Sequence, residues 1–120
     1  NLALQGGLEL PQNRVTAKQA LKPLTVADAL AKSDPADYTQ RRRVAYAFIE
    51  GASEPELSAM INALGSTKGK STEAIVADQI TILNLICFPR DAGVTRRLVG
   101  ELSKFGMSQQ DVDEHQTGIA

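Results

Sequence analysis

Apolar residues recur at the spacing of an α-helix along most of the chain. The clearest stripe, at relative positions i, i+3, i+4 and i+7, consists of Leu57, Met60, Ile61 and Leu64. A second stripe consists of Val94, Leu98, Leu102 and Phe105. The segment 73–88 is apolar on nearly every side in its second half, which is typical of a helix at the centre of a core. A buried strand over 80–88 is the alternative, because a short apolar run does not distinguish the two by pattern.

Capping residues divide this pattern into short helices. Helix starts are expected after Thr16, Thr25, Ser33, Ser53, Ser71 or Thr72, Asp91 and Ser108. Glu56 stands three residues after Ser53, which is the spacing of a capping box. Helix ends are expected at Gly51, Gly65 and Gly106, and at residue 88 before Pro89. Ser33 and Gly51 together predict one continuous helix over 34–50.

The first residues follow a different pattern. Leu2 and Leu4, and then Leu8 and Leu10, alternate with small or polar residues, and a Gly-Gly pair lies between them. Alternation around such a pair predicts a short β-hairpin or an extended arm over residues 1–15. A lone hairpin is marginal in water, so the arm is expected to pack on the body or on a partner.

These patterns predict an all-α protein. We expect an irregular or orthogonal bundle of five to seven short helices, forming a single domain over residues 16–120. The 120 residues include 42% hydrophobic residues, enough to bury a core without disulfides or metals. Aromatic residues make up only 4%, so this core is expected to be aliphatic.

Composition excludes several classes of function. The formal net charge is −1, whereas a non-specific nucleic-acid binder carries a basic excess. A Cys/His zinc site needs four ligands, and the chain contains one cysteine, Cys87, and one histidine, His115. The longest apolar run, at 80–88, is about half the length needed to cross a bilayer. We therefore expect no metal, no cofactor and no membrane insertion, and a location in a reducing compartment such as the cytoplasm or a virion.

Residues 65–72, "GSTKGKST", are close to the phosphate-binding loop G-x-x-x-x-G-K-[ST]. One residue is missing between Gly65 and Gly69. The segment before the loop, "PELSAMINAL", predicts a helix, whereas a P-loop follows a strand. Nucleotide hydrolysis is therefore not expected. The remaining interpretations are a solvated loop between helices, or an anion site formed by Lys68, Lys70 and the N–H groups that begin the next helix.

Basic residues suggest a second, weaker hypothesis. Arg41, Arg42 and Arg43 are consecutive, so on a helix they point in different directions. Arg41 falls at the apolar edge, where it either extends toward solvent or pairs with a carboxylate. A patch for nucleic acid would need these arginines to converge in space with Lys68, Lys70, Arg96 and Arg97.

Two further patterns carry little chemistry. Residues 94–115 have the outline of a helix-turn-helix, but the second helix carries Asp111, Asp113 and Glu114 and no lysine or arginine, so phosphates would repel it. His115 is expected to be exposed, and Cys87 is expected to be an unreactive thiol of the core. No pairing of a nucleophile with a base is visible.

The sequence therefore favours a non-enzymatic protein. The leading hypothesis is that the chain is an interaction or assembly protein, a subunit of a homo-oligomer or of a larger complex such as a viral structure. The leucines of the arm, Leu2, Leu4, Leu8 and Leu10, are the expected contact with a partner subunit. The alternative is a nucleic-acid-binding protein that uses the basic patch.

Overall fold

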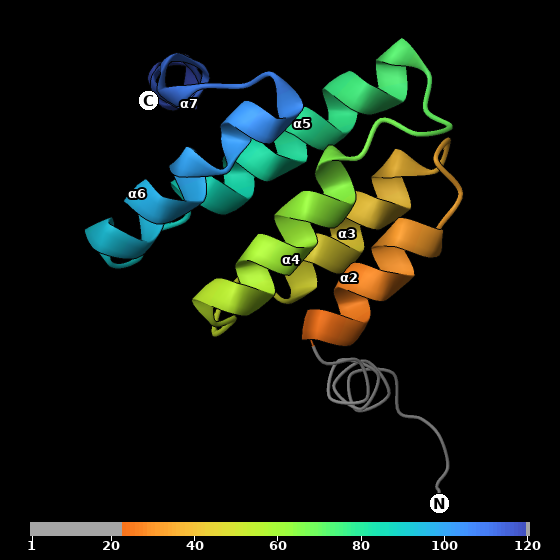
Figure 1. Ribbon diagram of the computed structural model, residues 1–120, viewed down its shortest axis with the longest axis horizontal. Helices are drawn as coiled ribbons and strands as arrows, with labels where there is room; N and C mark the ends of the chain where they lie inside the picture. The colour runs from red at the N-terminus through yellow and green to blue at the C-terminus, as the bar shows by residue number, and fades with distance from the viewer. Residues whose placement is uncertain (1–22, 120) are drawn as a thin grey trace, which may run out of the picture.

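The computed structural model describes residues 23–119, which form six α-helices and one short 3-10 helix with no strand among them (Figure 1). The elements are α2 (Pro23–Lys32), α3 (Tyr38–Ala47), α4 (Glu54–Gly65), α5 (Thr72–Cys87), α6 (Ala92–Gly100), η1 (Leu102–Phe105) and α7 (Gln109–Ile119). The predicted all-α fold is confirmed for this range. The arm expected over 1–15 and the helix expected after Thr16 lie outside the described residues.

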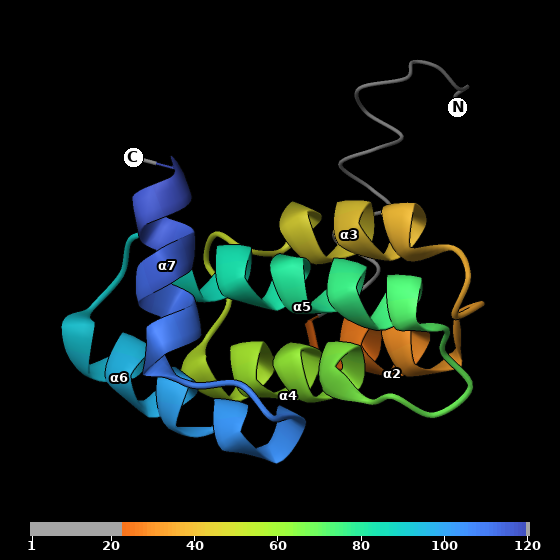
Figure 2. The same cartoon turned by 90° about the horizontal axis from the view of Figure 1, so that it is seen from above.

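Four helices form the body of the bundle. Helix α2 packs on α3 and α4, and α5 packs on the same two helices from the other side. These four run side by side in both views, while α7 crosses the end of α5 at a steep angle (Figures 1 and 2). Helix α6 packs on both α4 and α5, and contacts η1 and α7. Helices α3, α4, α6 and α7 therefore all pack on α5, the predicted central helix.

The core between these helices is aliphatic, as predicted. Its most deeply buried large side chains include Val26 of α2, Leu57, Met60, Ile61 and Leu64 of α4, Ile82, Leu85 and Ile86 of α5, Leu98 of α6 and Leu102 of η1. All four members of the first predicted stripe are at most 2% exposed, which confirms that this face of α4 points inward. Residues 80–87 are helical, so the alternative of a buried strand is wrong.

Most predicted helix boundaries are confirmed because their causes are local. Ser53 and Glu56 form the reciprocal capping box, with Ser53 N–H donating to the Glu56 carboxylate at 2.7 Å. Ser71 caps α5, accepting a hydrogen bond from the N–H of Ala74 at 3.2 Å. Asp91 caps α6 through the N–H groups of Gly93 and Val94. Each cap satisfies N–H groups that the first turn of a helix leaves without an internal partner.

The helix predicted over 34–50 is shorter at both ends. It begins after Asp37, whose carboxylate accepts from the N–H of Gln40 at 3.4 Å, and ends at Ala47. Ser33 is not its cap, because its hydroxyl instead donates to the carbonyl of Leu30 at the end of α2. Asp34 holds the intervening turn by accepting from the N–H of Ala36 at 2.9 Å. Asp34 and Asp37 thus compete with Ser33 for the role of cap, and each accepts from an N–H group of a residue that follows Ser33.

Two more boundaries differ from the prediction. Helix α2 begins at Pro23 and not after Thr25, and α6 ends at Gly100 and not at Phe105. Glycine is a weak helix former, and Glu101 next to it accepts hydrogen bonds from Ser58 and Asn62 of α4. The chain therefore tightens into η1, which still buries Leu102, and Gly106 closes it in a left-handed conformation at φ 72°.

Gly65, at the end of α4, is fixed by a close approach. A Cβ atom built there would lie 2.5 Å from the Cδ1 atom of the Phe105 ring, well inside van der Waals contact. The ring of η1 thus packs directly against the backbone of α4. Only a residue without a side chain leaves room for this contact.

We predict that Gly65→Ala destabilises the protein by about 1–3 kcal/mol, the usual cost of overpacking. Gly100→Ala is the matched control, because a Cβ there meets nothing within 4 Å and the residue is helical. The control is expected to be neutral or stabilising by up to about 1 kcal/mol, since alanine favours the helix. Urea denaturation followed by circular dichroism measures both. Equal stabilities of the two variants would contradict the proposed contact.

Candidate functional site

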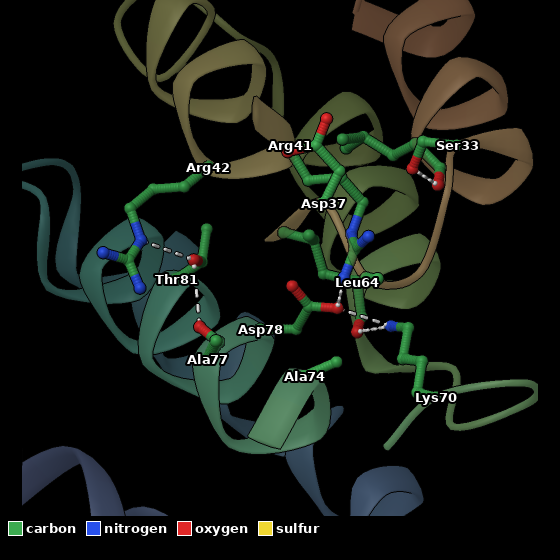
Figure 3. A network of polar contacts seen from close by, with 12 residues as sticks. Ser33, Asp37, Arg41, Arg42, Leu64, Lys70, Ala74, Ala77, Asp78 and Thr81 are labelled. Carbon is green, nitrogen blue, oxygen red and sulfur yellow. Dashed lines mark hydrogen bonds and ion pairs between the residues drawn. The ribbon is translucent and has the colours of Figure 1, made fainter. Parts of the chain in front are cut away.

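The basic residues singled out in the sequence do not form one surface. Arg41 of α3 and Lys70 of the loop before α5 do converge, but they meet below the surface on Asp78 of α5 (Figure 3). Lys68 lies exposed in the same loop. Arg96 and Arg97 are exposed on α6.

Asp78 is the centre of a buried cluster of charges. Its Oδ2 atom accepts from Nη2 of Arg41 at 2.7 Å and from Nζ of Lys70 at 2.7 Å. The side chains of Arg41, Lys70 and Asp78 are 3%, 7% and 1% exposed, so all three charges lie out of water. Charge-assisted hydrogen bonds of this length are the strong ones, and a low local dielectric strengthens them further. Of the two alternatives expected for Arg41, extension toward solvent or pairing with a carboxylate, the structure shows the second.

Backbone carbonyls complete the cluster. Arg41 also donates through Nη1 to the carbonyl of Asp34, and Lys70 donates through Nζ to the carbonyl of Leu64 at 2.8 Å. Leu64 lies in the last turn of α4, where free carbonyls carry partial negative charge. The cluster therefore joins the α2–α3 turn, the end of α4 and the middle of α5.

The cluster is not balanced in charge. Two cations face one carboxylate, and the Nε atom of Arg41 and the Oδ1 atom of Asp78 have no hydrogen-bond partner within the described residues. Such orphaned buried atoms are uncommon and call for a physical explanation. A surplus of positive charge thus lies just beneath the surface.

The neighbouring arginines of α3 point elsewhere. Arg42 is half-buried and donates through Nε to the hydroxyl of Thr81 at 3.3 Å, and Thr81 in turn donates to the carbonyl of Ala77 at 3.1 Å (Figure 3). Arg43 is exposed. The three consecutive arginines therefore have three environments, as expected from their spread around a helix.

Arg97 lies at the other end of α4 from Lys70. It pairs with Glu54, the first residue of α4, through two hydrogen bonds of 2.8 Å. These bonds from Arg97 lower the pKa of Glu54 and raise the pKa of Arg97 itself. Lys70, by contrast, binds Leu64 near the last residue of the same helix. The length of α4, twelve residues, separates the two halves of the predicted basic patch.

A pocket lies beside the charge cluster, between α2 and α4. Its volume is about 500 Å³, and Arg41, Lys68 and Lys70 contribute to its wall. The other lining residues are Ala27, Asp28, Leu30, Ala31, Ser33, Pro35, Ala59, Asn62, Ala63 and Ser66. One end of the pocket is thus cationic, and its sides are formed mostly by alanines.

A second hollow lies on the opposite side of α5. It has a volume of about 160 Å³ and lies between α5 and the turn that leads into α7. Val76 and Ile80 in its wall are 48% and 39% exposed, and they are the exposed large hydrophobic residues of the described range. Leu83 and Met107 form its apolar floor, and Asp111 lies at its edge. This surface is called the α5 groove below.

His115 is half-buried, so the prediction that it is exposed is wrong, and no sequence pattern indicates its role. The Nε2 atom of His115 lies 2.6 Å from Oδ1 of Asn84, whose amide donates to the hydroxyl of Tyr46 at 2.5 Å. This chain of hydrogen bonds ties α7, α5 and α3 together. Asn84 in an otherwise apolar stretch of α5 was the one signal that could have revealed it, because a half-buried amide needs partners.

Cys87 lies at the end of α5 next to Arg90. Burial raises the pKa of the Cys87 thiol, and the positive charge of Arg90 opposes this only in part. Arg90 donates to the carbonyl of Ile86 at 3.0 Å and lies 5.7 Å from the centre of the Phe88 ring. Its own pKa is lowered by burial. The thiol is therefore less reactive than a free cysteine, because only the thiolate attacks.

Within residues 23–119, no group of three acidic, histidine or cysteine side chains is placed to hold a metal ion. In the same range, no helix has the length and apolar character that a bilayer crossing requires. Comparisons of the chain with protein-family models, with curated proteins and with solved structures give no match. Function is therefore argued from the surfaces described above.

We predict that Asp78→Asn destabilises the protein by about 3–5 kcal/mol, because it leaves two buried cations without a counter-charge. Asp28→Asn is the matched control, since Asp28 forms an exposed pair with Lys32 at 3.1 Å. Removing such a pair costs at most about 1 kcal/mol. Urea denaturation of the two variants measures the difference.

Lys70→Met sharpens the same test. It removes the surplus cation and leaves the pair of Arg41 with Asp78 intact, so its cost is expected to be smaller than that of Asp78→Asn. An Asp78→Asn variant as stable as Asp28→Asn would show that the cluster does not constrain the fold.

We also predict that iodoacetamide alkylates Cys87 several times more slowly at pH 8 than it alkylates glutathione. The raised pKa leaves less thiolate at that pH, so the rate rises toward its plateau at higher pH than for a free thiol. Mass spectrometry over time gives the rate. In urea the rate is expected to match that of glutathione, and a native rate equal to it would contradict the effect of burial.

Proposed function

We propose that this chain is a non-enzymatic assembly protein, a subunit of a homo-oligomer or larger complex, and that the α5 groove is its docking surface. The observation that carries the proposal is the orientation of α5. This helix buries the charged residue Asp78 and leaves two apolar residues, Val76 and Ile80, exposed.

Successive residues of an α-helix differ in direction by about 100°, so residues two apart point to nearly opposite sides. Asp78 is 1% exposed, while Val76 and Ile80, two residues before and after it, are 48% and 39% exposed. A surface helix normally has the reverse arrangement. Exposed apolar patches rimmed by polar residues are typical of interaction sites.

The occupant that we propose is the arm of a second copy of this chain. Leu2, Leu4, Leu8 and Leu10 offer the alternating apolar side chains that a groove along a helix can accept. Apolar contact is the main source of free energy in such docking, at about 25 cal/mol per Å² buried.

Charge supports the same occupant. The segment 11–22 contains Arg14, Lys18 and Lys22 and no acidic residue. Helix α7, which begins next to the groove, carries Asp111, Asp113 and Glu114 and no lysine or arginine. The basic segment that follows the arm would therefore be attracted to α7 of the neighbouring copy, which orients the arm.

The alternative, nucleic-acid binding, has less support in the geometry. Arg41 and Lys70 are buried on Asp78, and Arg97 is paired with Glu54. Arg43, Lys68 and Arg96 are exposed, but they lie on different elements. A polyanion would find these cations dispersed, with the acidic α7 on the same molecule.

We predict that deletion of residues 1–10 weakens self-association, and that the double variant Val76→Gln, Ile80→Gln does the same. Each apolar side chain removed from a contact costs about 1.5 kcal/mol or more, so the dissociation constant is expected to rise at least about tenfold. Sedimentation velocity over a range of protein concentrations measures it. The double variant Ala29→Gln, Ala36→Gln, at two exposed alanines away from the groove, is the control and is expected to change nothing.

Unchanged sedimentation after both changes would remove the basis for the proposal. The same protein is tested for retention of RNA and DNA at about 50 mM salt, where phosphate contacts are strongest. Retention that falls steeply with added salt would favour the nucleic-acid alternative.

A further inference from the structure

We propose that the pocket between α2 and α4 binds a small molecule that combines a carboxylate or phosphate group with a compact apolar body. This site is separate from the α5 groove and is not required for assembly. Its volume of about 500 Å³ lies within the range of about 300–1,000 Å³ that is usual for small-molecule sites.

The anionic group is indicated by the surplus charge of the cluster. Arg41 and Lys70 both line the pocket, and their only acidic partner in the described range is Asp78. Asp78 does not itself line the pocket, so the cations and not the carboxylate form the part of the wall that a ligand would contact. An anion in the pocket would meet two positive charges that the fold already holds in place. The cost of removing these cations from water is met on folding and not on binding, which is the condition under which an ion pair contributes most to affinity.

The unpartnered Nε atom of Arg41 is a second, independent indication. It is buried and has no hydrogen-bond partner within residues 23–119, while both Nη atoms are used. Arg41 is 3% exposed, so bulk water does not satisfy this donor. An oxygen of a ligand in the pocket beside it, reached directly or through a bound water, would satisfy the donor.

Lys68 supplies the part of the site that can adapt. It is exposed, lines the same pocket, and makes no ion pair among the described residues. Lys70, two residues later, is fixed by Asp78 and Leu64. One lysine of the loop is therefore structural, and the other is free to close on a bound anion.

The apolar body is indicated by the side walls. Ala27 and Ala31 of α2 face Ala59 and Ala63 of α4, each pair one helical turn apart. Small side chains on both helices keep the space between them open, where leucines would fill it. Asp28 also lines the pocket, but its negative charge is balanced by the ion pair with Lys32. It therefore does not cancel the positive charge at the cationic end of the pocket.

The test uses hexanoate as the probe, and 1-hexanol as its neutral counterpart, on the full chain of 120 residues. Titration calorimetry gives the affinities, and the amide NMR signals of residues 66–70 report the site. We expect saturable binding of hexanoate with a dissociation constant of roughly 1 mM, and binding at least about tenfold weaker for hexanol, since one charge-assisted hydrogen bond contributes about 1.5 kcal/mol or more. No saturable hexanoate binding below about 10 mM would overturn the proposal.

Inorganic phosphate separates the two parts of the ligand. It is expected to bind more weakly than hexanoate, because it lacks the apolar body. Phosphate binding as tight as that of hexanoate would overturn the role given to the alanine walls, and hexanol binding as tight as hexanoate would overturn the role given to the cations.

Two variants that spare the buried cluster locate the site. Lys68→Ala is expected to weaken hexanoate binding about fivefold to tenfold, whereas Lys104→Ala, which removes the same charge from the exposed surface of η1, is expected to change it less than about twofold. Ala31→Leu places a larger side chain into the pocket from an exposed position of α2 and is expected to abolish binding. Equal effects of the two lysine variants, or full binding by Ala31→Leu, would place any binding elsewhere and overturn the proposal. The assembly state of the Lys68 and Ala31 variants is expected to equal that of the unmodified chain, which keeps this test distinct from that of the α5 groove.

Discussion

The carboxylate of Asp78 must be neutralised inside the bundle, and four parts of the chain are arranged around this requirement. Arg41 comes from α3 and Lys70 from the loop before α5, and each bonds the same oxygen at 2.7 Å. Through these two cations the cluster also holds the carbonyls of Asp34 and Leu64. The turn after α2 and the end of α4 are thereby fixed relative to the central helix.

Such a cluster contributes more to the specificity of the fold than to its net stability. Removing three charges from water costs several kcal/mol for each ion, and the attraction between them returns that cost only when the geometry is right. Helices α2, α4 and α5 bury similar aliphatic side chains, so hydrophobic contact alone would tolerate several alignments. The single arrangement that brings Arg41 and Lys70 to Asp78 excludes the others. Lys70, the residue of "GSTKGKST" at the position of the P-loop lysine, bonds the preceding helix at Leu64 and the following helix at Asp78.

The sequence was sufficient where structure depends on neighbours along the chain. The caps at Ser53, Ser71 and Asp91 follow from side chains that reach an N–H group two or three residues ahead. The prediction failed at α3, because Ser33, Asp34 and Asp37 all have the chemistry of a cap, and tertiary contacts decide among them. Arg41 pairs with a residue 37 positions away, and no periodicity predicts that distance.

The same limit applied to the candidate sites. The sequence suggests one surface of seven basic residues, but their positions depend on how the helices pack, and the packing turns Arg41 and Lys70 inward. The pocket between α2 and α4 could not be foreseen either, because alanines in a helical stripe indicate close packing as readily as open space. The sequence shows that the loop contains two lysines, Lys68 and Lys70. The structure is needed to show that Lys70 is buried and Lys68 is exposed.

The orientation of α5 links these observations. Because residues two apart on a helix point to nearly opposite sides, burying Asp78 among cations forces Val76 and Ile80 outward. Replacing Asp78 with an apolar residue, together with polar residues at 76 and 80, would give an ordinary amphipathic helix and a better isolated monomer. The chain instead retains a costly charge inside and an apolar pair outside. The proposed docking of another polypeptide on this outer face would account for both, since the exposed pair would then join a second core and the buried charge would fix the helix that presents it.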